Sequence, residues 1–318
     1  MLEFILLVIG LVLLVKGADV FVDKSSLLAR KLGVSSLVIG LTIVAFGTSL
    51  PELVVSVVSA WKKTTDIAIG NIVGANIANI LLILGIVLMM TPLTLKKATI
   101  WREIPISFFA ALFLLIAVNK TFFDNQGNIT RIEGIIMLSF FVLFIYHIRM
   151  LIKDKKTKYI NDKKAQNITH IELYGKIILG LIALYLGGQW VVNGVVAIAQ
   201  QLGVSQFLIS STIVAVGTTL PELFTAIAAI RKKEFDLAIG NIIGSNIFNI
   251  LFILGITSVI TSISHPISAN FNIIFLIFTT LLIFLFLFIG EKYKLKKWHG
   301  LVFLFLYGIY LAYLILRG

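Results

Sequence analysis

The sequence predicts an all-α polytopic membrane protein whose ten transmembrane helices form two inverted five-helix repeats. Three features support this fold: long apolar segments, an internal repeat at a fixed offset, and basic residues gathered in alternate loops. Hydrophobic residues make up 59% of the 318 residues and charged residues 13%, and the mean hydropathy is +1.04. A soluble domain carries roughly twice this charged fraction, so the composition favours a chain that lies mostly in a bilayer.

Ten apolar segments are long enough to cross a bilayer, which takes about 20 predominantly apolar residues. They lie near residues 1–22, 34–61, 67–92, 101–119, 131–152, 172–196, 203–230, 236–262, 270–289 and 298–316. We expect the first segment to be a retained helix rather than a cleaved signal peptide, because further membrane segments follow it. The chain has no cysteine, which excludes disulfides and thiol chemistry.

Residues 33–86 recur as residues 203–256 without a gap, at an offset of 170, and 32 of the 54 positions are identical. Five predicted helices separate equivalent points, and an odd number reverses the orientation of the second copy in the membrane. Secondary transporters commonly contain inverted repeats and bind substrate near the midplane at the repeat interface. A duplicated scaffold or a channel is the alternative. The predicted division is a first repeat at 1–152 (motif 40–86), a basic loop at 153–171 and a second repeat at 172–318 (motif 210–256).

The basic residues predict the orientation of the chain. Of the 27 Lys and Arg residues, 21 fall in alternate loops that would share one side of the membrane. Because cytoplasmic loops are enriched in Lys and Arg, we expect a multi-pass protein of the cell membrane with both termini outside and the 153–171 loop in the cytoplasm. The net charge of +12 then reports topology and does not indicate a nucleic-acid partner. The expected surroundings are lipid, and no obligatory protein partner is indicated.

Glu52 and Glu222 occupy equivalent positions of the two repeats and lie deep inside apolar segments. The other acidic residues, Glu103 among them, fall near segment ends or beside loops. A carboxylate near the bilayer centre costs on the order of 3 kcal/mol on insertion scales. Two of them at repeat-related positions therefore predict a functional site, the alternative being glutamates satisfied by neighbouring backbone.

A proline stands immediately before each glutamate and is expected to break the helix. Pro51 lacks an N–H and clashes with the preceding turn, and Gly47 loosens the same turn. The break should free the carbonyls of Ala45 and Thr48, and irregular backbone at this depth is tolerated only where it lines a cavity or is buried in protein. The second copy repeats this set as Ala215, Gly217, Thr218 and Pro221.

Hydroxyl groups beside the breaks add further oxygen ligands. Thr48 and Ser49 precede the first proline, and Thr218 and Thr219 precede the second. Carboxylate, carbonyl and hydroxyl oxygens suit calcium and sodium, whereas zinc and copper favour His or Cys ligands. The sequence therefore predicts a site for hard cations.

Asparagines spaced by four residues share one helix face and predict a second wall of the site. Asn79 and Asn249 are expected to line it, together with Ser245 on the same face as Asn249. Asn71 and Asn241 lie near segment starts and are expected to cap helices. Hydrogen bonding between helices is the alternative role for these stripes.

The charge of the predicted site favours exchange over one-way transport. Two carboxylates carry −2, which one Ca²⁺ neutralises, and an empty site would hold like charges close together in a low dielectric. The site should stay occupied by Ca²⁺, Na⁺ or protons, so a carrier of this kind acts as an exchanger. A passive channel is a further alternative. An intramembrane hydrolase would need a His pair, a Ser/Lys dyad or an Asp pair; the segments contain none, and no enzymatic activity is expected.

Paired motifs occur at 47–52 (Gly-Thr-Ser-Leu-Pro-Glu) with 70–76 (Gly-Asn-Ile-Val-Gly-Ala-Asn), and at 217–222 (Gly-Thr-Thr-Leu-Pro-Glu) with 240–246 (Gly-Asn-Ile-Ile-Gly-Ser-Asn). These motifs, and the whole chain, resemble the calcium/cation antiporter superfamily, specifically the sodium/calcium exchanger branch of prokaryotic type. The resemblance implies alternating access that exchanges Na⁺ for Ca²⁺ as substrates, without a cofactor. Antiport of H⁺, or of another divalent cation, through the same two glutamates is the alternative.

The resemblance also implies which residues bind the ions. Glu52 and Glu222 would bind them centrally, and further ligand roles would fall to Ala45, Thr48, Ser49, Asn79, Ala215, Thr218, Thr219, Ser245 and Asn249. Ala75 departs from the family pattern, which commonly has Ser there, so one hydroxyl ligand of a sodium site is missing. Asn249 stands where K⁺-dependent exchangers and some prokaryotic members carry Asp, which argues against K⁺ dependence.

Overall fold

The computed structural model describes residues 2–63, 65–119, 126–154, 168–203, 215–266 and 270–317. Within these ranges, seven helices are long and apolar enough to cross a membrane, and a bent pair, Ser36–Thr48 with Leu50–Trp61, makes an eighth. Asn270–Phe286 is a shorter apolar helix, and the segment predicted at 203–230 includes residues outside the described ranges. The polytopic, all-helical fold is therefore confirmed, and the count of ten spans stays a prediction.

The first half of the chain contains the following α-helices, π-helical segments (η) and short strands. They are α1 (Leu2–Leu32), α2 (Ser36–Ile39), η1 (Gly40–Val44), α3 (Ala45–Thr48), α4 (Leu50–Trp61), α5 (Thr65–Ala78), η2 (Asn79–Ile83), α6 (Leu84–Met90), β1 (Leu93–Thr94), η3 (Thr99–Glu103), α7 (Ile104–Val118), β2 (Gln126–Ile129) and α8 (Arg131–Asp154).

The second half repeats much of this order. It contains α10 (His170–Gln201), α12 (Ala215–Thr218), α13 (Leu220–Arg231), α14 (Phe235–Ile247), η5 (Phe248–Leu254), α15 (Gly255–Ile260), β3 (Ile263–Pro266), α16 (Asn270–Phe286), β4 (Lys294–Leu295) and α17 (Lys297–Arg317).

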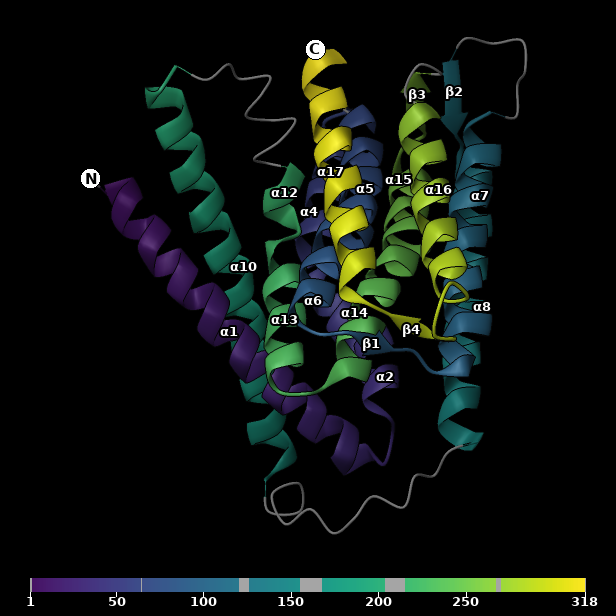
Figure 1. The fold of residues 1–318 in the computed structure, drawn as a ribbon. Helices are drawn as coiled ribbons and strands as arrows, with labels where there is room; N and C mark the ends of the chain where they lie inside the picture. Colours follow the sequence, from purple (N-terminus) through teal and green to yellow (C-terminus); the bar gives the residue numbers. More distant parts are fainter. Residues whose placement is uncertain are drawn as a thin grey trace.

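Figure 1 shows α1 and α10 as two long helices that cross beside a compact bundle formed by the other helices. The start of α1 and the end of α17 lie at one end of the molecule, whereas the end of α8 and the start of α10 lie at the other. Two antiparallel strand pairs link connections that are distant in sequence: β1 pairs with β4, and β2 pairs with β3. The start of α1 and the end of α17 thus lie on the opposite side of the bundle from the end of α8 and the start of α10.

Glycines allow α1 and α10 to approach closely where they cross. A Cβ atom built on Gly10 would lie 2.9 Å from the carbonyl oxygen of Gly187, and one on Gly187 would lie 2.8 Å from the carbonyl oxygen of Gly10. Gly17 and Gly180 form a second contact of this kind, because a Cβ atom built on either would lie 3.1 Å from the carbonyl oxygen of the other. Small residues at helix crossings permit tight packing where the surrounding solvent is lipid.

The duplicated sequence adopts the same unusual backbone in both copies. Gly33 and Gly203 have φ angles of 65° and 75°, and Lys63 and Lys233 have φ angles of 58° and 60°. Lysine seldom occupies this left-handed region. Its presence at two positions 170 residues apart shows that the tight turn after each motif is repeated in detail.

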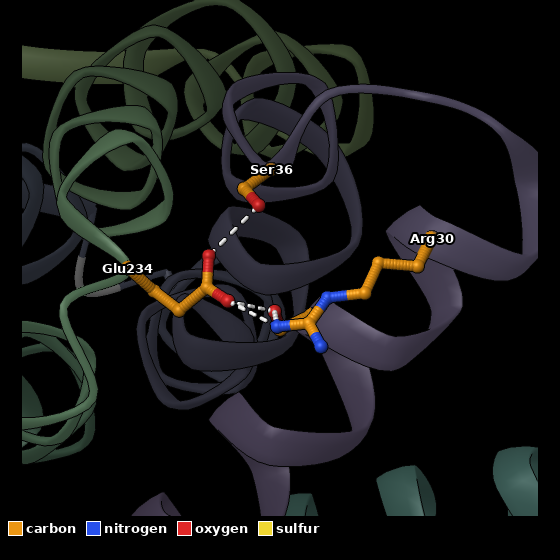
Figure 2. Close-up of polar contacts among 4 residues, drawn as sticks. Arg30, Ser36 and Glu234 are labelled. Carbon is orange, nitrogen blue, oxygen red and sulfur yellow. Dashed lines mark hydrogen bonds and ion pairs between the residues drawn. The ribbon is translucent and has the colours of Figure 1, made fainter. Parts of the chain in front are cut away.

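Glu234 connects three segments at the start of α14 (Figure 2). Its carboxylate accepts hydrogen bonds from Arg30 Nη2 at 2.8 Å, from Ser36 Oγ at 2.9 Å, and from Ser26 Oγ. Burial raises the pKa of Glu234, but these donors and the Arg30 charge outweigh it and hold the pKa below its ordinary value. The carboxylate therefore ties α1 and α2 to the connection between α13 and α14.

Candidate ion-binding site

Both repeats interrupt a helix directly before the proline that precedes the glutamate. Ser49 (φ −84°, ψ 10°) separates α3 from α4, and Thr219 (φ −87°, ψ 2°) separates α12 from α13. In the first copy the two parts are bent by 47°. Pro51 and Pro221 fall in the first turn of the following helix, where the missing N–H removes no helical hydrogen bond. The backbone breaks thus occur at the positions predicted from the sequence.

The breaks place the two glutamates at helix starts inside the protein. Glu52 and Glu222 lie in the first turns of α4 and α13, and their exposed fractions are 0% and 1%. The first turn of a helix has backbone N–H groups without helical partners and carries the positive end of the helix dipole. Each break therefore gives a buried carboxylate a favourable local field in a helix whose residues are otherwise mostly apolar.

The motif of each repeat contacts the carboxylate of the other. Ser49 Oγ donates a hydrogen bond to Glu222 Oε1 at 3.2 Å, and Thr48 also lies beside Glu222. In the opposite direction, Thr218 lies beside Glu52. Like charges brought to one buried site repel each other. The site is therefore assembled across the interface of the two repeats.

Five buried oxygens at this interface have no hydrogen-bond partner among the described residues. They are Glu52 Oε1, Glu52 Oε2, Glu222 Oε2, Asn79 Oδ1 and Asn249 Oδ1. A buried polar atom without a partner costs about 1–3 kcal/mol, and more when it is charged. All five atoms can only accept when the glutamates are ionised. A cation with hard-oxygen preference fits this set, because it would satisfy the oxygens and neutralise the carboxylates together.

Two further asparagines orient Asn79 and Asn249. Asn79 Nδ2 donates to Asn246 Oδ1 at 3.0 Å, and Asn249 Nδ2 donates to Asn76 Oδ1 at 2.9 Å. With their nitrogens held in this way, Asn79 and Asn249 present their oxygens as acceptors. Asn76 and Asn246 were not among the predicted site residues, although both end a repeated motif in the sequence. Asn79 begins η2 and Asn249 lies in η5, and π-helical segments often occur at functional sites.

The expectation that Asn71 and Asn241 cap helices is wrong. Asn241 is completely buried inside α14, and its Oδ1 accepts a hydrogen bond from Thr48 Oγ1 at 3.0 Å. Asn71 lies within α5, and its Oδ1 accepts from Thr218 Oγ1 at 3.3 Å. Both asparagines therefore hold hydroxyls of the opposite repeat. Their spacing of four from position 75 or 245 was the signal that placed them on the lining face.

The remaining predicted ligands differ in how they are placed. Ser245 is fully buried, with its Oγ 3.5 Å from Thr48 Oγ1, and Thr219 Oγ1 donates to the carbonyl of Val216 at 2.7 Å. The carbonyl of Ala45 is not released as expected, because it accepts the N–H of Ser49 at 3.1 Å. It would have to use its second lone pair to bind an ion. Ala215 begins α12, and its side chain is outside the described part of the chain.

Gly47 and Gly217 have a packing role that the sequence did not indicate. A Cβ atom on Gly47 would lie 2.5 Å from Leu181 Cδ2, and one on Gly217 would lie 2.1 Å from Val192 Cγ2. Both neighbours belong to α10. The two glycines therefore let a single helix lie against both broken segments, in addition to any loosening of the turn.

Glu103 is a buried acid that the sequence placed beside a loop. It lies in η3 with an exposed fraction of 0%, and its Oε1 is 3.4 Å from His147 Nε2. Its position near a segment end did not predict this complete burial. Within the described ranges, no group of three or more His, Cys, Asp or Glu side chains is arranged to hold a metal ion, so neutral oxygens must supply much of any coordination shell.

Known proteins share both the sequence and the fold of this chain. The family described as "Sodium/calcium exchanger protein" matches residues 2–150 and 173–316. The chain is 32% identical to the sodium/calcium exchanger MaX1 of Methanosarcina acetivorans, covering 98% of each protein, and 36% identical to the inner membrane protein YrbG of Escherichia coli, covering 80% of this chain and 79% of that one. A solved structure of the sodium-calcium exchanger NCX_Mj superposes with a TM-score of 0.82 at 32% identity, covering 98% of both chains.

The matched family covers nearly the whole chain and both halves of the site, and its members are transporters rather than enzymes. The chain therefore belongs to the sodium/calcium exchanger family of membrane antiporters.

Proposed function

We propose that this protein exchanges Na⁺ for Ca²⁺ by alternating access, with Glu52 and Glu222 as the central ion ligands. The observation that carries the proposal is the set of five buried acceptor oxygens without partners, contributed by two glutamates and two asparagines of both repeats. Ca²⁺ takes several oxygen ligands and balances two carboxylates. Thr48, Ser49, Thr218, Thr219, Ser245 and the carbonyls of Ala45 and Ala215 complete the proposed ligand set.

Exchange follows from the electrostatics of this site. When both carboxylates are ionised their charges repel, so reorientation without a bound cation is costly in a low dielectric. A site that is always neutralised carries cations in each direction, so the release of Ca²⁺ is coupled to the binding of Na⁺. The name of the relative MaX1 supports sodium as the counter-ion.

Antiport of H⁺ against Ca²⁺ is the second candidate, and Ala75 is the observation that favours it. Ala75 is buried, with an exposed fraction of 1%. It lies in α5, which also contains Asn71 and is followed directly by Asn79. Its counterpart in the second repeat is Ser245. The missing hydroxyl weakens a sodium position, whereas protonation of the glutamates needs no additional ligand.

The proposed topology has ten spans in two inverted five-helix repeats, with both termini outside and the 153–171 loop in the cytoplasm. It is supported by the repeated backbone at an offset of 170, by the start of α1 and the end of α17 lying at one end of the bundle, and by the basic residues. Each strand pair joins connections assigned to the same side, β1–β4 inside and β2–β3 outside.

Calcium uptake into proteoliposomes tests the proposed coupling. Vesicles loaded with Na⁺, with choline or with acid are diluted into Na⁺-free buffer that contains radioactive Ca²⁺. We expect uptake only into Na⁺-loaded vesicles, because the outward Na⁺ gradient drives exchange. Uptake that follows internal acid and ignores Na⁺ would assign H⁺/Ca²⁺ antiport, and equal uptake into all three would indicate a channel.

A further inference from the structure

A basic crevice lies between α1 and α10, away from the ion site. It has a volume of about 560 Å³ and is lined by residues of α1, of α10 and of the turn after α13. Four lysines contribute to it: Lys16, Lys24, Lys176 and Lys232. Three separate segments thus bring their positive charges to one hollow, which a solvated charge run on a single helix would not do.

The charges in the crevice leave an excess of positive charge. Asp19 and Asp23 are the acidic residues of the lining, so the four lysines and two aspartates sum to +2, or to +1 when Glu172 beside Lys176 is counted. Lys24 Nζ lies 2.8 Å from Asp23 Oδ2. Lys176 Nζ lies 2.5 Å from Glu172 Oε1, at an exposed position where such pairs contribute little. An anion that enters the crevice therefore meets lysine ammonium groups held by weak ion pairs.

The walls of the crevice continue into the apolar surface of the same helices. Val20 and Leu179 line it with exposed fractions of 38% and 63%, and Ile178 and Ile182 are also exposed on α10, at 54% and 49%. In a membrane protein, exposed apolar side chains of this kind contact acyl chains. The hollow therefore combines a cationic part with an adjoining lipid-facing wall, which a free inorganic anion would not use.

The two α1 lysines place the crevice near the level of the lipid headgroups. Lys16 lies 14 residues after Leu2, and Lys24 lies 22 residues after it, or roughly 21 and 33 Å along a helix that rises 1.5 Å per residue. The hydrocarbon core is about 30 Å thick. With the hydrocarbon beginning near Leu2, Lys16 lies roughly 9 Å inside the far edge of the core and Lys24 just beyond it. The crevice therefore spans this edge, and the long Lys16 side chain reaches toward the polar region from the apolar side.

We propose that this crevice binds the phosphate headgroup of an anionic glycerophospholipid, with an acyl chain along Val20 and Leu179. Basic hollows between transmembrane helices on the cytoplasmic side are suited to such headgroups. The bound lipid bridges α1 and α10 beside the Gly17–Gly180 contact. It depends on neither the ion site nor the direction of transport.

Native mass spectrometry of the purified full-length protein tests this site, with dioleoylphosphatidylglycerol as the probe. The variant Lys16→Gln/Lys176→Gln removes two of the four lysines. Each lysine near the membrane surface contributes about 1 kcal/mol to the binding of an anionic lipid, or roughly fivefold in affinity. We therefore expect the affinity for the most tightly bound lipid to fall roughly 25-fold. The matched control Lys292→Gln/Lys297→Gln removes two basic residues of predicted inner loops that do not line the crevice, and it should bind as the wild type does.

Further comparisons distinguish loss of the site from misfolding, and a lipid headgroup from free phosphate. The charge-preserving variant Lys16→Arg/Lys176→Arg should retain the adduct. The proposal is overturned if both glutamine variants lose affinity equally, or if Lys16→Gln/Lys176→Gln binds phosphatidylglycerol as the wild type does. It is also overturned if inorganic phosphate binds with the same lysine dependence, or if phosphatidylcholine binds as tightly. Because transport is not measured, failure here leaves the exchange proposal unaffected.

Discussion

Asn76 and Asn246 occupy equivalent positions of the two repeats, 170 residues apart, and each donates its side-chain amide to the backbone carbonyl of the other. The two N···O distances are 3.2 and 3.4 Å. The side-chain oxygens of the same pair accept from Asn249 and Asn79. Four asparagines thus form one buried network in which every member is held by the opposite repeat, as expected for a site on a pseudo-two-fold axis.

Replacing Asn246 by Ala should lower both stability and Ca²⁺ affinity. The substitution leaves the Asn79 amide without its acceptor, and an unsatisfied buried donor costs about 1–3 kcal/mol. Asn79 then loses the hydrogen bond that holds its amide nitrogen and so fixes which way its oxygen points. Thermal unfolding with and without Ca²⁺ measures both effects. Asn193→Ala, at an exposed position of α10, is the control, and equal behaviour of the two variants would contradict a positioning role for Asn246.

Glu52→Gln and Glu222→Gln should each abolish coupled Ca²⁺ flux while the protein remains folded. Each substitution removes half of the negative charge, and loss of one member of a buried charge pair costs about 3–5 kcal/mol, or at least 100-fold in Ca²⁺ affinity. Uptake assays and Tm with and without Ca²⁺ check this. Full exchange by both variants would exclude the proposed site, and the exposed Glu291→Gln serves as control.

Ala75→Ser should strengthen the dependence of transport on Na⁺. The added hydroxyl occupies a buried position equivalent to Ser245 in the other repeat, and a neutral oxygen ligand suits Na⁺. We expect the Na⁺ concentration that gives half-maximal Ca²⁺ uptake to fall by roughly three- to tenfold. This corresponds to about 1 kcal/mol, the net free energy of one hydrogen bond. Measuring uptake against internal Na⁺ tests this. An unchanged Na⁺ dependence with intact transport would place position 75 outside the sodium site.

Gly217→Ala should destabilise the protein more than Gly47→Ala. The new methyl group would lie 2.1 Å from Val192 Cγ2 in the first case and 2.5 Å from Leu181 Cδ2 in the second. Val is branched at Cβ and has little rotamer freedom, whereas the end of a Leu side chain can move aside. Overpacking typically costs about 1–3 kcal/mol. The double variant Gly217→Ala/Val192→Ala should recover much of the lost Tm, and no recovery would mean that the clash lies elsewhere.

Glu234 should give the protein an acid-sensitive contribution to stability. Its folded-state pKa is held below the ordinary value of 4.5, so this contribution is complete above pH 4.5 and is lost as pH falls through the lower folded-state pKa. Glu234→Gln should lower the free energy of unfolding at neutral pH by about 1 kcal/mol after allowance for partial exposure, and Tm should fall with it. The variant should also lose less stability than the wild type when the pH is lowered. Tm curves between neutral and acid pH test this, and parallel curves for the two proteins would rule it out.

Local chemistry alone determined much of this protein. The duplication, the apolar segments, the breaks before Pro51 and Pro221, and the buried placement of Glu52 and Glu222 all follow from the sequence. They do so because a proline acts on its own turn, and because a carboxylate inside an apolar segment is costly wherever the helix packs. The same reasoning located Thr48, Ser49 and Asn79 near the site.

Only the tertiary structure decided which side chains hold one another. Asn71 and Asn241 became partners of hydroxyls in the opposite repeat, Asn76 and Asn246 became the support of the ligand amides, and Glu103 became buried beside His147. Gly47 and Gly217 proved to be contact points for α10. These relationships join residues that are tens to hundreds of positions apart, so they depend on how helices cross, and the spacing of residues along one helix does not specify the helix that it meets.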